Sequence, residues 1–137
     1  MIETVGAIMV RDGKVLLGLR AAHKSFAGCW DVIGGHVEAG EESWQALCRE
    51  LREEVGVVAM AGTFIDTLSI GTVPLHLFLV SEWKGDPSRC NDEHAEVRWF
   101  DPVKAAALPD LLSPDYRPVL LALARGGSAV DHATRPG

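Results

Sequence analysis

Residues 35–57 read GHVEAGEESWQALCRELREEVGV, and this stretch decides how the rest of the chain is interpreted. It follows a short apolar segment, begins in a glycine-rich turn and continues as a run in which apolar residues recur at helical spacing. The run predicts a helix over residues 43–55. Gly56 ends it, because glycine is the residue most often found just past the end of a helix.

The predicted helix carries three carboxylates on one face. On a wheel of about 100° per residue, Glu50, Glu53 and Glu54 lie together beside the apolar stripe. Like charges at these spacings destabilise a helix, and the helix dipole disfavours anions toward the C-terminal end. Two interpretations remain open: a solvated acidic face balanced by Arg49 and Arg52, or an oxygen-ligand site for a hard cation such as Mg²⁺ or Mn²⁺.

The spacing of the whole stretch distinguishes them. Gly35 is followed by five residues, Glu41, seven residues and then RELREEVGV. This agrees at all nine specified positions with the Nudix box, G-x5-E-x7-R-E-U-x-E-E-x-G-U, where U is aliphatic. A chance match in a chain of this composition has a probability on the order of 10⁻⁷. The chain therefore resembles the Nudix hydrolases, with Ile33 standing where the family often has proline.

The resemblance implies an α/β fold, a Nudix-type α/β/α sandwich with a mixed, mostly antiparallel sheet. We expect a Nudix domain over residues 1–127 and a disordered tail over residues 128–137. Asp12-Gly13 predicts a hairpin turn. The predicted strands are residues 5–10, 14–19, 57–70, 72–83 and 96–100, and residues 30–37 form a short apolar segment interrupted by Gly34-Gly35. The predicted helices are residues 43–55, a short turn at 103–108, and 113–125 with Ser113 as its N-cap.

The resemblance also implies an activity, the metal-dependent hydrolysis of a pyrophosphate bond in a nucleoside diphosphate linked to another moiety. The cofactor would be Mg²⁺ or Mn²⁺, and Glu50 or Glu53 would activate the attacking water. Arg49 and Glu41 would support them. The implied metal ligands are the Gly34 carbonyl, Glu50, Glu53, Glu54 and a further acid from another loop, for which Glu93 is favoured over Glu96.

The substrate is less sharply indicated. Arg20 is a candidate for phosphate contact or simply a solvated residue, and His23 and Phe26 are candidates for a base pocket. A minimal single domain favours a (deoxy)nucleoside triphosphate or oxidised nucleotide, giving monophosphate and pyrophosphate. ADP-ribose or a nucleotide sugar is the alternative. A non-catalytic nucleotide-sensing Nudix module is the third interpretation. Such proteins usually lose box glutamates, whereas this chain keeps all four.

The length, charge and cysteine content of the chain exclude several classes of protein. The chain has 137 residues and a net charge of −6, which fits a small-molecule nucleotide substrate better than a nucleic-acid polymer. No apolar run approaches the roughly 20 residues of a membrane span. The three cysteines form no C-x-x-C pair, which favours a reducing compartment, so we expect a cytoplasmic monomer or homodimer without a membrane partner.

Overall fold

The structure is a computed structural model that describes residues 2–125. Its strands and helices, in chain order, are β1 (Thr4–Arg11), β2 (Lys14–Arg20), β3 (Trp30–Asp31), β4 (Ile33–His36), α1 (Ser43–Val55), β5 (Val58–Ile70), β6 (Val73–Lys84), β7 (His94–Phe100), α2 (Pro102–Ala106) and α3 (Tyr116–Ala124). The tail expected over residues 128–137 lies outside the described residues.

The first hairpin organises the sheet. Strands β1 and β2 pair only next to the turn, at Val10 with Val15 and at Arg11 with Lys14. Beyond that point they separate: β1 pairs with β4 and, in parallel, with β6, whereas β2 pairs with β3 and β7. The strand order is β3-β2-β1-β6-β5, and every pair except β1 with β6 is antiparallel. The predicted mixed, mostly antiparallel sheet is confirmed.

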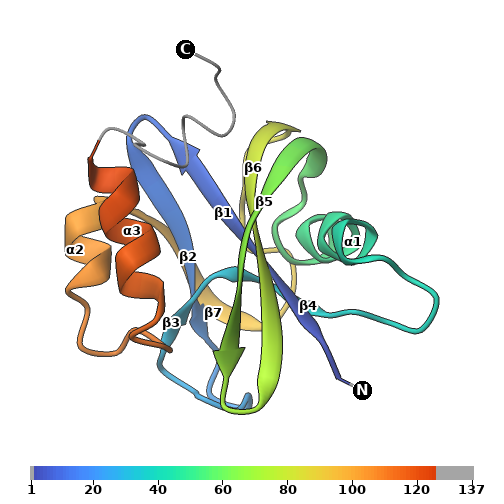
Figure 1. Ribbon diagram of the computed structural model, residues 1–137, viewed down its shortest axis with the longest axis horizontal. Helices are drawn as coiled ribbons and strands as arrows, with labels where there is room; N and C mark the ends of the chain where they lie inside the picture. The colour runs from blue at the N-terminus through green and yellow to red at the C-terminus, as the bar shows by residue number, and fades with distance from the viewer. Residues whose placement is uncertain (1, 126–137) are drawn as a thin grey trace.

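The helices cover the two faces of this sheet, α1 on one and α2 with α3 on the other, as Figure 1 shows. Each face has its own apolar core. Leu47, Leu51 and Val55 of α1 are fully buried in one. Leu120 and Leu123 of α3 are buried in the other. The α/β/α sandwich is therefore built on two cores that share the strands between them.

Helix α1 has the predicted bounds, and local interactions fix both of its ends. The Glu42 backbone N–H donates to Gln45 Oε1 at 2.9 Å, one half of a capping box. Gly56 has φ 73°, the left-handed conformation that glycine adopts without strain, and its N–H donates to the Arg52 carbonyl. A helix held at both ends keeps the positions of its carboxylates fixed relative to the sheet.

The third helix differs from its prediction. Helix α3 begins at Tyr116, so Ser113 is not its N-cap. The Ser113 hydroxyl accepts instead from the backbone N–H of Asp115 at 3.1 Å, a local turn that precedes the helix. Within residues 2–125, no helix is long and apolar enough to cross a membrane.

Candidate active site

A cleft of about 300 Å³ lies where β4, the C-terminal half of α1 and the loops after β2 and before β7 converge. Six of the predicted site residues line it: Arg20, Phe26, Gly34, Glu50, Glu54 and Glu93. The others, His23, Glu41, Arg49, Glu53 and Glu96, are not among its lining residues. Glu96 pairs instead with Arg98 at 2.6 Å. The structure thus brings together residues from four separate segments of the chain.

The carboxyl groups of Glu50 and Glu54 contact each other at the wall of this cleft. Glu54 is 3% exposed. Burial, and then a hydrogen bond and repulsion from Glu50, raise the pKa of Glu54 well above its ordinary value. His94 lies 3.4 Å from Glu54, but burial lowers the pKa of the imidazole and favours its neutral form. In the absence of a cation, these surroundings therefore favour the protonated form of Glu54.

Gly35 explains how Glu50 reaches this position. A Cβ atom at residue 35 would overlap the Glu50 carboxylate. The carboxylate therefore lies directly against the backbone of β4, in space that only glycine leaves open. The glycine of the box and its first helix glutamate are thus in contact across the turn that joins β4 to α1.

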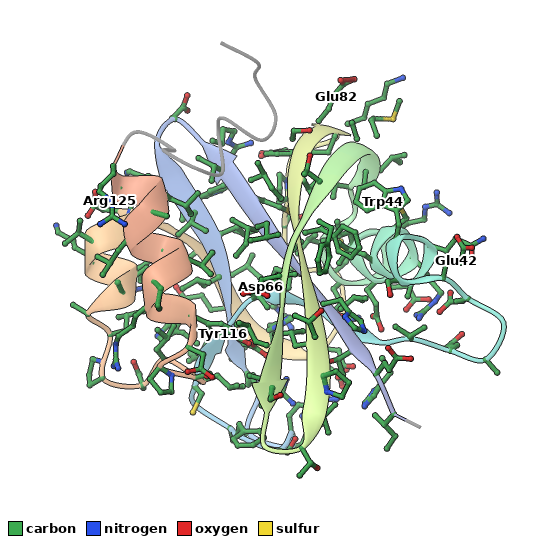
Figure 2. All side chains as sticks on the ribbon, in the orientation of Figure 1. Glu42, Trp44, Asp66, Glu82, Tyr116 and Arg125 are labelled. Carbon is green, nitrogen blue, oxygen red and sulfur yellow. The ribbon has the colours of Figure 1, made fainter. Side chains whose placement is uncertain are left out.

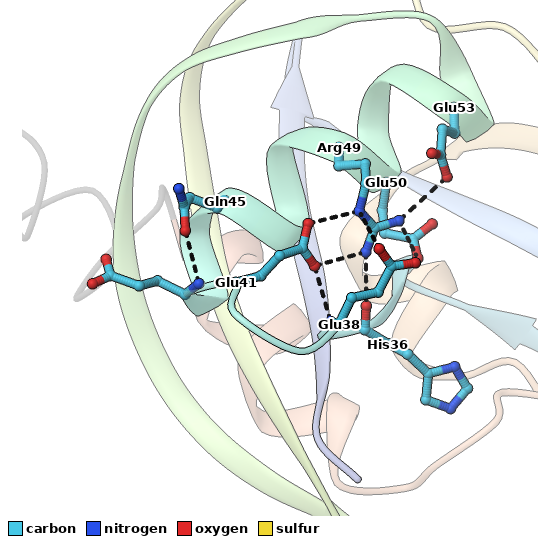
Figure 3. Close-up of polar contacts among 8 residues, drawn as sticks. His36, Glu38, Glu41, Gln45, Arg49, Glu50 and Glu53 are labelled. Atoms are coloured by element: carbon cyan, nitrogen blue, oxygen red, sulfur yellow. Dashed lines mark hydrogen bonds and ion pairs between the residues drawn. The ribbon is translucent and has the colours of Figure 1, made fainter.

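Arg49 contacts the carboxylates of Glu41, Glu50 and Glu53 (Figure 3). Its guanidinium donates to both Glu41 oxygens, at 2.8 and 3.0 Å, and to Glu53 at 3.3 Å. It also donates to the His36 carbonyl at 3.0 Å and lies 3.4 Å from Glu50. The hydrogen bonds from Arg49 lower the pKa of Glu41 to about 2. Arg49 thus ties the turn before the helix to the helix itself.

The predicted metal ligands do not all converge. Within residues 2–125, no three His, Cys, Asp or Glu side chains are grouped to hold a metal ion. Glu53 turns toward Arg49 with 54% of its side chain exposed, and Glu93 Oε2 pairs with Lys24 Nζ at 2.7 Å. Glu50 and Glu54 remain, and this pair fits a divalent cation, because adjacent carboxyl groups supply the oxygen ligands that a hard cation prefers and the cation offsets the repulsion between them.

The cleft also contains a pair that the sequence did not indicate. The Tyr116 hydroxyl donates to Asp31 Oδ1 at 2.6 Å, and Val32 N–H donates to the same oxygen. Burial raises the pKa of Asp31 despite these bonds. The two residues lie 85 positions apart, so no local pattern joins them. The available signal was Asp31 itself, a lone acid between apolar Trp30 and Val32.

Arg20 is held by other residues of the protein in this cleft. The sequence had left open whether it contacts phosphate or is solvated. Its Nε donates to the Ser25 carbonyl at 2.6 Å, and its Nη1 lies 3.4 Å from Asp31 Oδ2. Phe26 lies in the same loop, 58% exposed, with a positive φ of 56° that is unusual for a bulky residue. The loop after β2 therefore presents an aromatic ring at the cleft while Arg20 anchors the base of the loop.

Comparison with known families agrees with this geometry. Residues 2–123 match the model of the NUDIX domain. The chain belongs to the Nudix family. This Nudix hydrolase is 40% identical over 124 residues to a CTP pyrophosphohydrolase of Escherichia coli (strain K12), with 88% of this chain and 89% of the relative covered. It is 30% identical over 125 residues to an 8-oxo-dGTP diphosphatase of the same organism, with 88% and 94% covered.

A solved structure supports the fold of this Nudix hydrolase independently. The solution structure of the E. coli ORF135 protein superposes with a TM-score of 0.74 at 37% identity, over 100% of this chain and 94% of the other. Since the family match covers nearly all described residues and the named relatives are pyrophosphohydrolases, the protein is an enzyme that hydrolyses phosphorus anhydrides.

Proposed function

We propose that this Nudix hydrolase cleaves a (deoxy)nucleoside triphosphate or an oxidised nucleotide to a monophosphate and pyrophosphate, with Mg²⁺ or Mn²⁺ as cofactor. The observation that carries the proposal is the contact between Glu50 and Glu54 at the wall of the cleft, within a complete box. The relatives named as CTP pyrophosphohydrolase and 8-oxo-dGTP diphosphatase support this substrate class.

The proposed residue roles combine the match to the box with the contacts of each side chain. We assign Glu50, Glu53, Glu54, Glu93 and the Gly34 carbonyl to the cation, which supplies charge neutralisation at the phosphates and a more acidic water when bound. Glu50 or Glu53 would accept the proton of the attacking water. Both carboxylates lie within 3.4 Å of the Arg49 guanidinium, which keeps them oriented.

Five residues are assigned outside the metal ligands: Arg49 and Glu41 as supports, and Arg20, Phe26 and His23 toward the nucleotide. Arg49 and Glu41 form a bidentate pair that holds the turn before α1 in place. Arg20 and Phe26 line the cleft from the loop after β2, where a guanidinium suits a phosphate and an aromatic ring suits a base. His23, in the same loop but outside the lining, is kept as a candidate base contact.

The cellular setting proposed for this activity is the cytoplasm. Cys29, Cys48 and Cys90 are all free thiols, which suits a reducing compartment. Nucleoside triphosphates are small anionic substrates. An acidic chain with a net charge of −6 needs a cation to approach them, so the metal requirement and the charge of the chain are consistent.

A panel of nucleotides tests the proposal. CTP, dGTP, 8-oxo-dGTP and ADP-ribose are incubated with Mg²⁺, Mn²⁺ or excess EDTA, and the products are separated by ion-exchange chromatography. We expect a triphosphate to give monophosphate and pyrophosphate, faster at alkaline pH because the water must lose a proton, and no turnover in EDTA. Preference for ADP-ribose would replace the proposed substrate class, and full turnover in EDTA would remove the metal from the mechanism.

The matched variant is Glu53→Gln, which keeps the shape of the side chain and removes its charge. We expect kcat to fall by about 10²–10⁴, or roughly 3–5 kcal/mol of barrier. Glu82→Gln, at an exposed position on β6, is the control for a lost negative charge and leaves kcat unchanged. A decrease of less than threefold at Glu53 would place the chemistry elsewhere.

A further inference from the structure

Two long cationic side chains line the cleft, and they differ in how firmly the protein holds them. Arg20 is fixed by Ser25 and Asp31. Among residues 2–125, Lys24 has one ion-pair partner, Glu93, at 2.7 Å between Nζ and Oε2. The Lys24 and Glu93 side chains are 31% and 38% exposed, so water reaches both. Lys24 is thus the cation of this cleft that is held least firmly.

The backbone holds these two residues close together whether or not their side chains pair. The Ala21 N–H donates to the Glu93 carbonyl at 3.2 Å, and the Lys24 N–H donates to the Ala21 carbonyl at 3.0 Å. Arg20 and His94 are register partners between β2 and β7. The two loops therefore stay in contact when the ion pair breaks, and only the side chains need to move.

The ion pair with Lys24 also keeps the Glu93 carboxylate away from Glu50 and Glu54, so that it is not available as a further metal ligand. Glu93 lines the same cleft as Glu50 and Glu54 but is turned toward Lys24. A partly exposed ion pair contributes little to stability, so a divalent cation outcompetes one ammonium for this carboxylate at small cost. Once a divalent cation binds Glu93, the Lys24 ammonium group is left in the cleft without its counterion. Phosphate oxygens of a substrate can then replace the carboxylate.

We propose that Lys24 is an exchangeable positioning residue: it pairs with Glu93 in the metal-free enzyme and transfers to a phosphate group of the substrate when a divalent cation binds Glu93. This inference rests on the proposed function, because it takes Glu93 as a metal ligand. The exchange couples the two ligands. Lys24 opposes binding of the cation alone and favours binding of the cation together with a phosphate, and this coupling is reciprocal.

The first test measures Mn²⁺ binding to the metal-free protein without any nucleotide, by the electron paramagnetic resonance signal of free Mn²⁺. Lys24→Gln removes the competing ammonium, so we expect Mn²⁺ to bind about two- to fivefold more tightly. Lys14→Gln is the matched control, because it removes the same charge at the opposite end of β2. Its Mn²⁺ affinity stays at the wild-type value.

A double-mutant cycle separates the exchange from a general charge effect. In a Glu93→Gln background, replacing Lys24 no longer tightens Mn²⁺ binding, because the carboxylate for which the two cations compete is gone. A purely structural Lys24 predicts the opposite sign, weaker or unchanged Mn²⁺ binding in Lys24→Gln. Either that result, or equal tightening in Lys14→Gln, would overturn the inference, as would the absence of Mn²⁺ binding to the wild type.

The second test adds the phosphate ligand. Preformed Mn²⁺–pyrophosphate is titrated into each protein by calorimetry, and Lys24→Gln is expected to bind it about tenfold more weakly than wild type and Lys14→Gln. Equal binding would overturn the transfer to phosphate. Failure of the proposed function gives a different result. If Lys24→Gln binds Mn²⁺ more tightly but the wild type hydrolyses no triphosphate, the proposed substrate is wrong and the exchange at Glu93 stands.

Discussion

Glu41 and Glu54 carry the same side chain at opposite ends of the Nudix box, and the structure shifts their pKa values in opposite directions. Arg49 holds Glu41 with two hydrogen bonds and lowers its pKa. Glu54 is buried beside Glu50, and its pKa is raised. The box therefore contains a balanced region, where Arg49 favours the charged form of Glu41, and an unbalanced region, where burial and repulsion from Glu50 disfavour the charged form of Glu54. The second region suits an added metal ion.

Among the substitutions that compare these two regions, the largest effect is expected from Gly35→Ala, which alters the unbalanced region. The new Cβ overlaps the Glu50 carboxylate, so that side chain must leave the cleft. We expect kcat to fall by about 10²-fold, since a displacement of about 1 Å costs that much. The comparison in a steady-state assay is with Gly62→Ala, whose Cβ meets the Trp44 ring on another side of α1. Equal losses in both variants would mean that crowding around the helix, and not Glu50, is responsible.

Glu54→Gln should raise the stability of the metal-free protein. The folded state holds the Glu54 proton, and the unfolded chain releases it above its ordinary pKa of 4.5, so wild type loses stability as pH rises from there. The variant keeps the shape without this loss. We expect it to be more stable by about 1–2 kcal/mol at pH 8 and similar to wild type near pH 4.

The stabilities of wild type and Glu54→Gln are compared by thermal melts in EDTA and in millimolar Mg²⁺. Mg²⁺ should stabilise wild type more than Glu54→Gln, because only ions bound to the native state shift the unfolding equilibrium. An equal Mg²⁺ shift in both proteins would contradict Glu54 as a ligand. Figure 2 shows the control position, Glu82, whose replacement by Gln leaves both melts unchanged.

The smallest effect is expected at Glu41, in the balanced region. A carboxylate with a lowered pKa stabilises the fold above its unfolded pKa of 4.5, and that contribution is lost as pH falls through about 2. Glu41→Gln should therefore melt below wild type at pH 7, with a gap that narrows between pH 4.5 and 2. A difference in melting temperature that does not depend on pH would show that the Arg49 hydrogen bonds, and not the charge of Glu41, stabilise the fold.

The sequence was sufficient for the parts of the fold that depend on local signals. The α1 bounds and the turn at Asp12-Gly13 follow from residues that are adjacent in the chain. The start of α3 was wrong because Ser113, a good N-cap by type, uses its hydroxyl in a turn that the sequence does not distinguish from a cap. Propensity alone does not decide between two local hydrogen bonds for one side chain.

Inside the box the sequence placed side chains relative to one another, whereas outside it Arg20, Phe26 and Glu93 could be named as candidates but their contacts could not. Glu50 and Glu54 share a helix face and could be placed together from their spacing. The pairs Asp31 with Tyr116 and Lys24 with Glu93 join distant segments. Their contact depends on which strands become neighbours, and β2 must lie beside β7 before the loops that carry Lys24 and Glu93 can meet. No local pattern specifies that arrangement.

The divided hairpin has a consequence for the order in which the protein folds. Beyond their turn, β1 and β2 complete their pairing mainly with β6 and β7, strands from much later in the chain. Contacts of this kind close long loops before they gain stability, which slows folding. During synthesis, the N-terminal hairpin emerges long before its partners. The cleft between its separated strands is therefore among the last parts of the molecule to form, only after residues beyond His94 have left the ribosome.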